Sequence, residues 1–229
     1  QEETVADQQI KAIASAYGGI DKAMKTNEKS VKGVKQEYTE MTAIIDAMNY
    51  AGNNYAVTSA DVAQGLSKFA SVAKASGAEA YQAMSYVVGA NETVQNASKV
   101  GTAMKTIISR MDGLQASAKD GSIYTNKTAL ALKTIAGINI LDDNKQLKDF
   151  NDLITEVGEK WTSLGKNEKI ALAEAIAGKN QLNVFQAMMD NWQTVLQYQG
   201  EYKEGFMVGS AEVENARFID SLEGRIVQL

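Results

Sequence analysis

Apolar residues recur at alternating intervals of three and four along the first fifty positions, with Asn27 as the only polar member. The series is Ile10, Ile13, Tyr17, Ile20, Met24, Asn27, Val31, Val34, Tyr38, Met41, Ile45 and Met48. An apolar repeat of 3.5 residues favours a helix that winds around a partner helix, and a single buried Asn can fix the register of such a pair. The pattern predicts a heptad-patterned helical arm over residues 1–49. The alternative is an amphipathic helix packed on its own domain, kinked or broken into a hairpin at Gly18-Gly19.

Helical periodicity resumes after a predicted linker at residues 50–57. Thr58 and Asp61 have the spacing of a capping box, in which a hydroxyl and a carboxylate pair with free N–H groups at a helix start. Residues 118–143 are the most loop-like part, with only a short helical signal around Leu130 to Ile135. The first apolar faces are Val62, Leu66, Phe69 and Ala73, ended by Gly77; then Tyr81, Met84 and Val88; then Val100, Met104, Ile107, Met111 and Leu114, closed by Gly113 or residues 119–121.

Three more apolar faces are predicted from Asn144 onward. They are Leu147, Phe150, Ile154, Val157, Trp161 and Leu164; Phe185, Met188, Met189, Trp192 and Leu196; and Phe218, Leu222, Ile226 and Leu229. Amphipathic faces of this kind normally exist to be buried in a core. Because no segment alternates strictly with period two, the chain is predicted to be all-α. We expect the helical arm to be followed by a multi-helix bundle over residues 58–229.

The composition removes several kinds of chemistry. The chain has neither Cys nor His, which excludes disulfides, thiolate zinc sites and triads that use a histidine base. A net charge of −5 argues against nucleic-acid binding through a broad basic face. The longest apolar stretch is interrupted by Lys133 and is too short for a transmembrane helix. No cofactor or metal is predicted.

Two acidic pairs are the remaining candidates for catalysis. Asp142 and Asp143 lie in what is predicted to be a loop that ends in a helix cap. Glu156 and Glu159 lie three residues apart on a predicted solvated helix face. Since a catalytic carboxylate needs its pKa retuned by its surroundings and no apolar pocket is evident, we assign no catalytic residue.

The Gly178-Lys179 pair could suggest a phosphate-binding loop. Such a loop needs a glycine five positions before this one and a hydroxyl after the lysine, but Ala173 and Asn180 stand there. The segment also follows a predicted helix rather than a strand. We therefore interpret it as a helix junction, with Gly178 in a left-handed conformation and Asn180 capping the next helix.

Residues 99–110, with the sequence KVGTAMKTIISR, closely resemble the signature of bacteriophage tail tape measure proteins. Matching blocks follow in the order typical of that family at residues 134–164, 170–192 (IALAEAIAGKNQLNVFQAMMDNW) and 221–229 (SLEGRIVQL). The resemblance covers residues 58–229 and is specific in combination. The matching positions are Lys99, Gly101, Lys105, Arg110, Gly178, Lys179, Gln181, Trp192 and Gly224. We expect structural roles for all of them: glycines at helix junctions, cations at solvated faces or helix ends, and Trp192 in the core.

The resemblance implies a non-enzymatic structural protein of a phage or prophage tail. A tape measure protein is assembled in the host bacterial cytoplasm, occupies the lumen of the virion tail, sets tail length, and leaves through the tip ahead of the DNA. Its expected partners are the tail tube protein, the tail assembly chaperones and the tail tip or baseplate proteins. The chain would be a fragment of a longer protein, and residues 10–48 could mediate self-association.

Two other functions fit the sequence pattern. A helical secreted effector or export-targeting module would also combine an amphipathic hairpin with a coiled-coil arm. A murein-degrading segment could use a lone carboxylate such as Glu156 or Glu159, because tape measure chains can carry wall-cleaving domains.

Overall fold

The computed structural model describes residues 5–18, 29–31, 34–36, 40–114 and 126–216, and it is all-α apart from one small ribbon. The ribbon consists of β1 (Lys29–Val31) and β2 (Val34–Gln36), which pair antiparallel. The helices are α1 (Val5–Ile13), a π-helical turn η1 (Ala14–Gly18), α2 (Glu40–Asn54), α3 (Ser59–Ser67), α4 (Ala70–Ala75), α5 (Ala80–Val94), α6 (Ala97–Asp112), α8 (Lys127–Ala136), α9 (Phe150–Trp161), α10 (Lys166–Ala177), α11 (Leu182–Asp190) and α12 (Trp192–Lys203).

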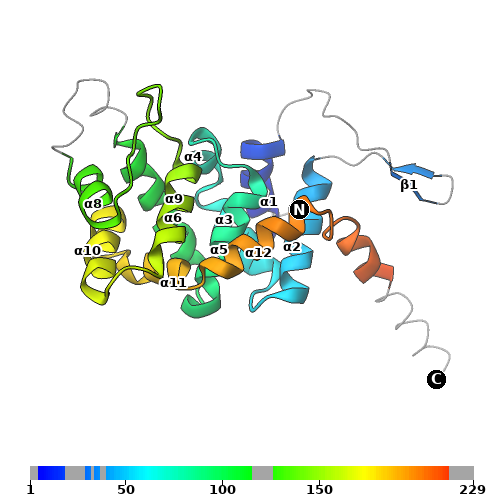
Figure 1. The fold of residues 1–229 in the computed structure, drawn as a ribbon. Coiled ribbons are helices and arrows are strands. Elements are labelled where there is room, and N and C mark those ends of the chain that lie inside the picture. Colours follow the sequence, from blue (N-terminus) through cyan, green and yellow to red (C-terminus); the bar gives the residue numbers. More distant parts are fainter. Residues whose placement is uncertain (1–4, 19–28, 32–33, 37–39, 115–125, 217–229) are drawn as a thin grey trace.

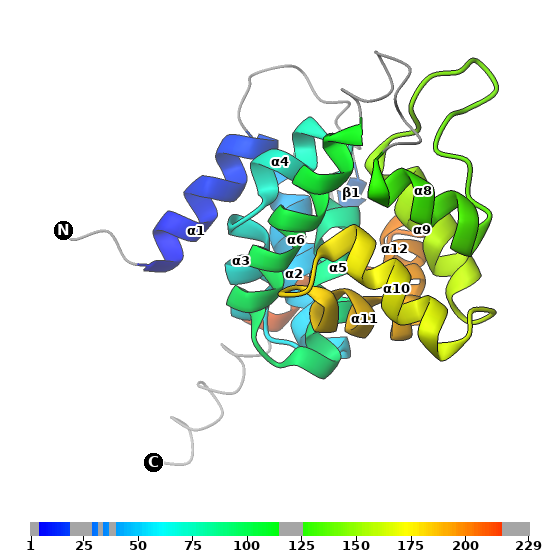
Figure 2. The ribbon, with the colours of Figure 1, turned by 90° about the vertical axis from the view of Figure 1, so that its left-hand side faces the viewer.

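Helix α5 runs through the middle of the helical body (Figures 1 and 2). Every residue from Ala83 to Asn91 is buried, so this helix is enclosed on all sides. Helices α3, α6, α11 and α12 pack around it. In Figure 1, α8 and α10 lie at one end of the body, and α1 and α2 lie at the other. The structure is therefore a helical bundle built around one central helix.

The heptad series does not form one helix. Strands β1 and β2 lie in the middle of it, with Val31 opposite Val34. At the two ends of the series, Ile13, Tyr17 and Met48 are buried in the same core as the rest of the domain, whereas Ile45 is exposed. This corrects the expectation of a continuous arm: α1 and α2 bury their apolar faces against their own domain. Asn27 lies outside the described residues, and pairing of this segment with another chain stays a prediction.

Several predicted boundaries differ from the structure. Helix α2 extends through Asn54, inside the predicted linker at 50–57. The face from Val62 to Ala73 belongs to two helices, because the chain turns at Lys68 and Phe69 between α3 and α4. Helix α8 lies within the stretch 118–143 that was predicted to be mostly loop. The division of the chain into an arm and a core region remains a prediction.

The start of α9 also differs. The apolar series from Leu147 predicted a helix from about Asn144, but Leu147 pairs with Leu141 in an isolated β-bridge. The helix begins at Phe150, because the Asp149 side chain accepts a hydrogen bond of 2.9 Å from the Asp152 N–H and caps it there. Among the described residues, no helix is both long and apolar enough to cross a lipid bilayer.

Candidate functional site

Helix α6 carries the first group of motif residues and crosses α3 at close range. The helix is capped by Asn96, whose side-chain oxygen accepts a hydrogen bond of 2.9 Å from the Lys99 N–H. Gly101 is buried, and a Cβ atom placed on it would lie 2.2 Å from the carbonyl oxygen of Gly65. The two backbones can approach this closely only because Gly101 has no side chain. Lys99 and Lys105 are exposed on the outer face of the helix.

The second group lies at the junction of α10 and α11. Gly178 ends α10 with φ of 77° and ψ of 162°, and its N–H donates to the Glu174 carbonyl at 2.9 Å. Its φ is positive as expected, but its ψ lies outside the left-handed helical region, in a conformation that essentially only glycine adopts. The guanidinium of Arg110, from the end of α6, lies over it: Nη1 would be 2.8 Å from a Cβ at Gly178.

The residues after Gly178 are arranged differently from the prediction. The N-cap position of α11 is Gln181 rather than Asn180, and no side chain caps this helix by a hydrogen bond. Asn180 and Lys179 are exposed. The Lys179 Nζ lies 3.8 Å from a carboxylate oxygen of Glu174, which is a weak surface ion pair.

Trp192 is buried in the core, as predicted. It is 3% exposed at the first position of α12, and its indole lies against the backbone of Gly158 in α9. Arg110 and Gly178 are thus brought together from separate motif blocks, whereas Gly101 faces α3 and Trp192 faces α9. Gly224 lies outside the described residues. The motif positions that the structure describes include three points of close helix contact.

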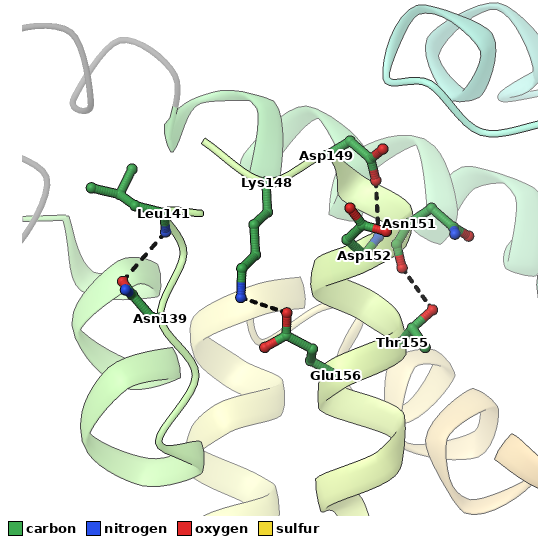
Figure 3. Close-up of polar contacts among 8 residues, drawn as sticks. All are labelled: Asn139, Leu141, Lys148, Asp149, Asn151, Asp152, Thr155 and Glu156. Atoms are coloured by element: carbon green, nitrogen blue, oxygen red, sulfur yellow. Dashed lines mark hydrogen bonds and ion pairs between the residues drawn. The ribbon is translucent and has the colours of Figure 1, made fainter. Parts of the chain in front are cut away.

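Figure 3 shows Glu156 on α9 with its carboxylate toward Lys148, and Asp149 and Asp152 at the start of the helix. Glu156 forms an ion pair of 2.6 Å with Lys148, and Glu159 is exposed. Burial raises the pKa of the Asp152 carboxyl, with smaller contributions from the negative charges of Asp149 and Glu156. Within the described ranges, no three Asp, Glu, His or Cys side chains are grouped so that they could hold a metal ion.

Asp142 stabilises a turn. Its carboxylate accepts a hydrogen bond of 2.7 Å from the Gln146 N–H, and the Asp142 N–H donates to the Gln146 carbonyl at 2.8 Å. Its neighbour Asp143 is exposed. This pair thus lies in a loop, as predicted, but it caps a turn and not a helix.

Sequence reasoning missed a groove between α2 and the segment 206–214. Its volume is about 740 Å³, and it is lined by Tyr50, Asn53, Asn54, Phe206, Val208, Gly209, Ser210, Val213 and Glu214. The buried carboxylate of Asp46 holds the segment in place by accepting hydrogen bonds from the N–H groups of Gly209 (2.7 Å) and Ala211 (3.0 Å). The available signal was a set of apolar residues after Gly205 that belonged to no predicted helix face.

The groove exposes large apolar side chains. Phe206 is 60% exposed, Val213 52% and Val208 42%. Neighbouring apolar residues that stay exposed are typical of sites for protein contacts. The features that the described residues provide are therefore helix contacts that stabilise a fold and a surface suited to another protein.

Comparison with known proteins identifies the family of the chain. The family model described as phage-related minor tail protein matches residues 3–178, which is more than half of the chain. The match includes α6 with Gly101 and Arg110, and it ends at Gly178. No solved structure matches the chain. The chain belongs to the family of phage-related minor tail proteins.

Proposed function

We propose that this minor tail protein is part of a tape measure protein, which sets tail length and acts in tail assembly and genome delivery. The observation that carries the proposal is the series of motif blocks at 99–110, 134–164, 170–192 and 221–229, in the order of tape measure proteins. Membership in the minor tail protein family makes the chain a phage tail component. The roles in setting tail length, in tail assembly and in genome delivery, and the location in the tail lumen, are proposals that go beyond the family assignment.

The partners of such a protein follow from its place in the tail. The tail tube protein would surround it, tail assembly chaperones would hold it before the tube forms, and tip or baseplate proteins would contact its end. The close helix contacts at Gly101, Gly178 and Trp192 would then keep this region folded while these partners assemble on it.

The compact shape favours an assembly role over a ruler role for this region. A compact chain of this length has a radius of gyration of about 17 Å, whereas a single helix is only about 10–12 Å across. Such a domain fits poorly inside a narrow tube. We therefore place it at the end of the tail as an assembly nucleus, or partly unpacked in the lumen, with long helices elsewhere in the protein acting as the ruler.

The test is an in-frame deletion of residues 1–229 from the tape measure gene, with tails examined by electron microscopy. We expect no tails, although the shortened protein is still made, because the assembly nucleus is lost. Tails shortened by about 340 Å, the rise of one helix of this length, would instead make this region a ruler. A density map that showed residues 58–229 compact and midway along the lumen would also contradict the proposed placement.

A further inference from the structure

Acidic residues outnumber basic residues in the two segments that form the groove between α2 and residues 206–214. Residues 40–54 and 201–216, which include both sides of the groove, contain six acidic residues and one basic residue, Lys203. Glu214 lines the groove itself, and Glu212 is exposed next to the lining residue Val213. An apolar groove with an acidic rim complements a segment that combines apolar residues with lysine or arginine.

A segment of that chemistry precedes α2 in the chain. Residues 22–35 (KAMKTNEKSVKGVK) hold five lysines and a single acidic residue, Glu28, with Met24, Val31 and Val34 between them. Part of this segment forms the ribbon of β1 and β2. In Figure 1 the ribbon stands apart from the helical body, beyond the end where α2 lies.

We infer that the groove binds the lysine-rich segment 22–35 of a second copy of this chain. Both elements are present on each copy, so two copies related by a two-fold axis can exchange them reciprocally, and both grooves are filled. The acidic rim disfavours the two other common targets of exposed surfaces, because anionic membranes and nucleic acids would be repelled. Apolar contact with Phe206, Val208 and Val213 supplies affinity, and the charges supply orientation.

The inference is independent of the proposed tape measure role, because it is tested on the purified chain alone. Sedimentation velocity over a micromolar concentration series is expected to show a dimer that dissociates as salt is raised. Reversal of two acidic residues, Glu204→Lys with Glu212→Lys, is expected to raise the dimer dissociation constant roughly tenfold. Reversal of two lysines, Lys29→Glu with Lys35→Glu, is expected to have the same effect.

Combining the four substitutions restores opposite charges across the interface, so we expect the dissociation constant to return to near its original value. The matched control is Asp143→Lys with Glu159→Lys, which makes the same change in net charge at two exposed positions away from the groove. Phe206→Ser removes exposed apolar surface without changing charge, and it should also weaken the dimer.

A chain that stays monomeric at low salt would overturn the inference and leave the groove to another protein of the tail. Failure of the four-substitution variant to restore association would also overturn it. The same holds if the control pair weakens the dimer as much as the groove pair does. Far-UV circular dichroism of each variant ensures that a lost dimer is not the result of a lost fold.

Discussion

Gly158 of α9 and Trp192 of α12 touch so closely that the indole occupies the place of a side chain at position 158. A Cβ atom built on Gly158 would lie 2.1 Å from Cε2 and 2.4 Å from Nε1 of the Trp192 ring. Trp192 is 3% exposed and stands at the first position of α12. The absence of a side chain at Gly158 therefore decides how α12 docks on the rest of the bundle.

We expect Gly158→Ala to lower the free energy of unfolding by roughly 1–3 kcal/mol, because an added methyl group overfills a packed core. The measurement is urea denaturation followed by circular dichroism. Gly200→Ala is the control, since a Cβ at Gly200 meets no atom within 4 Å. Within helix α12 that change should stabilise by about 0.5–1 kcal/mol. If Gly158→Ala and Gly200→Ala changed the free energy of unfolding equally, the contact between Gly158 and Trp192 would not contribute to stability.

Backbone conformation is expected to dominate at Gly178. Its φ of 77° and ψ of 162° are essentially restricted to glycine, so Gly178→Ala should destabilise by about 1–3 kcal/mol. Gly137 is a useful comparison, because its φ of 67° and ψ of 17° are left-handed helical and no atom lies within 4 Å of its Cβ position. Gly137→Ala should cost less, about 1–2 kcal/mol.

The contribution of Arg110 can be separated from that of the backbone. Its guanidinium is the flexible end of an exposed side chain and can move aside from a Cβ at Gly178. Addition of Arg110→Ala to Gly178→Ala should therefore recover little of the lost stability in the same urea experiment. Full recovery would show that Gly178→Ala loses stability through a clash with Arg110 and not through backbone strain.

The capping box at the start of α3 should contribute measurably to stability. The Thr58 hydroxyl accepts from the Asp61 N–H at 3.0 Å, and the Asp61 carboxylate accepts from the Thr58 N–H at 3.0 Å. Thr58→Ala should cost about 0.5–2 kcal/mol in thermal or urea unfolding. Asn180→Ala should change stability by less than about 0.5 kcal/mol, because Asn180 is exposed and does not cap α11. A larger loss of stability for Asn180→Ala than for Thr58→Ala would favour Asn180 as the cap of α11, as the sequence predicted.

Buried tyrosines should make the fold sensitive to alkaline pH. Burial raises the pKa values of Tyr86 and Tyr198 above their ordinary value, and burial followed by the hydrogen bond to Glu201 raises that of Tyr55. Above about pH 10 the unfolded chain loses these phenolic protons while the folded chain keeps them. Stability is thus fully present below pH 10 and falls as the pH rises further, by about 1.4 kcal/mol per pH unit for each of the buried Tyr86 and Tyr198, and by less for the partly exposed Tyr55.

Tyr86→Phe tests this directly, because it removes one titrating group from the core. The fall in stability above pH 10, followed by thermal unfolding at stepped pH, should be shallower by the contribution of one group. Met104→Leu is the matched control, since Met104 is equally buried and does not titrate. If both variants keep the wild-type dependence on pH, Tyr86 ionises in the folded state as easily as in the unfolded state.

The carboxylates near α9 are not expected to cleave peptidoglycan. The Glu156 carboxylate is engaged by Lys148 at 2.6 Å, and Glu159 is exposed to solvent. Incubation of the purified chain with peptidoglycan should release no soluble fragments. If fragments appear, Glu156→Gln and Glu159→Gln variants would show which carboxylate is responsible, and the murein-degrading alternative would replace the structural one.

Local features were predictable from the sequence because their physical causes lie within a few residues. The capping box of Thr58 and Asp61 and the glycine that ends α4 at Gly77 both act over a single helical turn. The all-α class follows from periodicity of the same range. The order of motif blocks was enough to indicate a phage tail protein, and the family match agrees at that level.

Features that depend on distant partners could not be predicted in this way. The heptad series specified an apolar face but not what would cover it, and the fold covers its two ends with the domain's own core. In the same way, the sequence shows that residues 83–91 contain Ser85 and Asn91, but not that every position there is buried.

The sequence by itself determined the all-α class, the capping box of Thr58 and Asp61, and the phage tail family. Only the tertiary structure decided that Trp192 lies on Gly158, that Arg110 lies over Gly178, and that α2 forms a groove with residues 206–214. A repeating apolar pattern predicts that a face will be buried. It does not predict against which surface, because burial of apolar area stabilises a fold whichever surface covers it. The choice of surface depends on shape and on long-range contacts, which no local pattern contains.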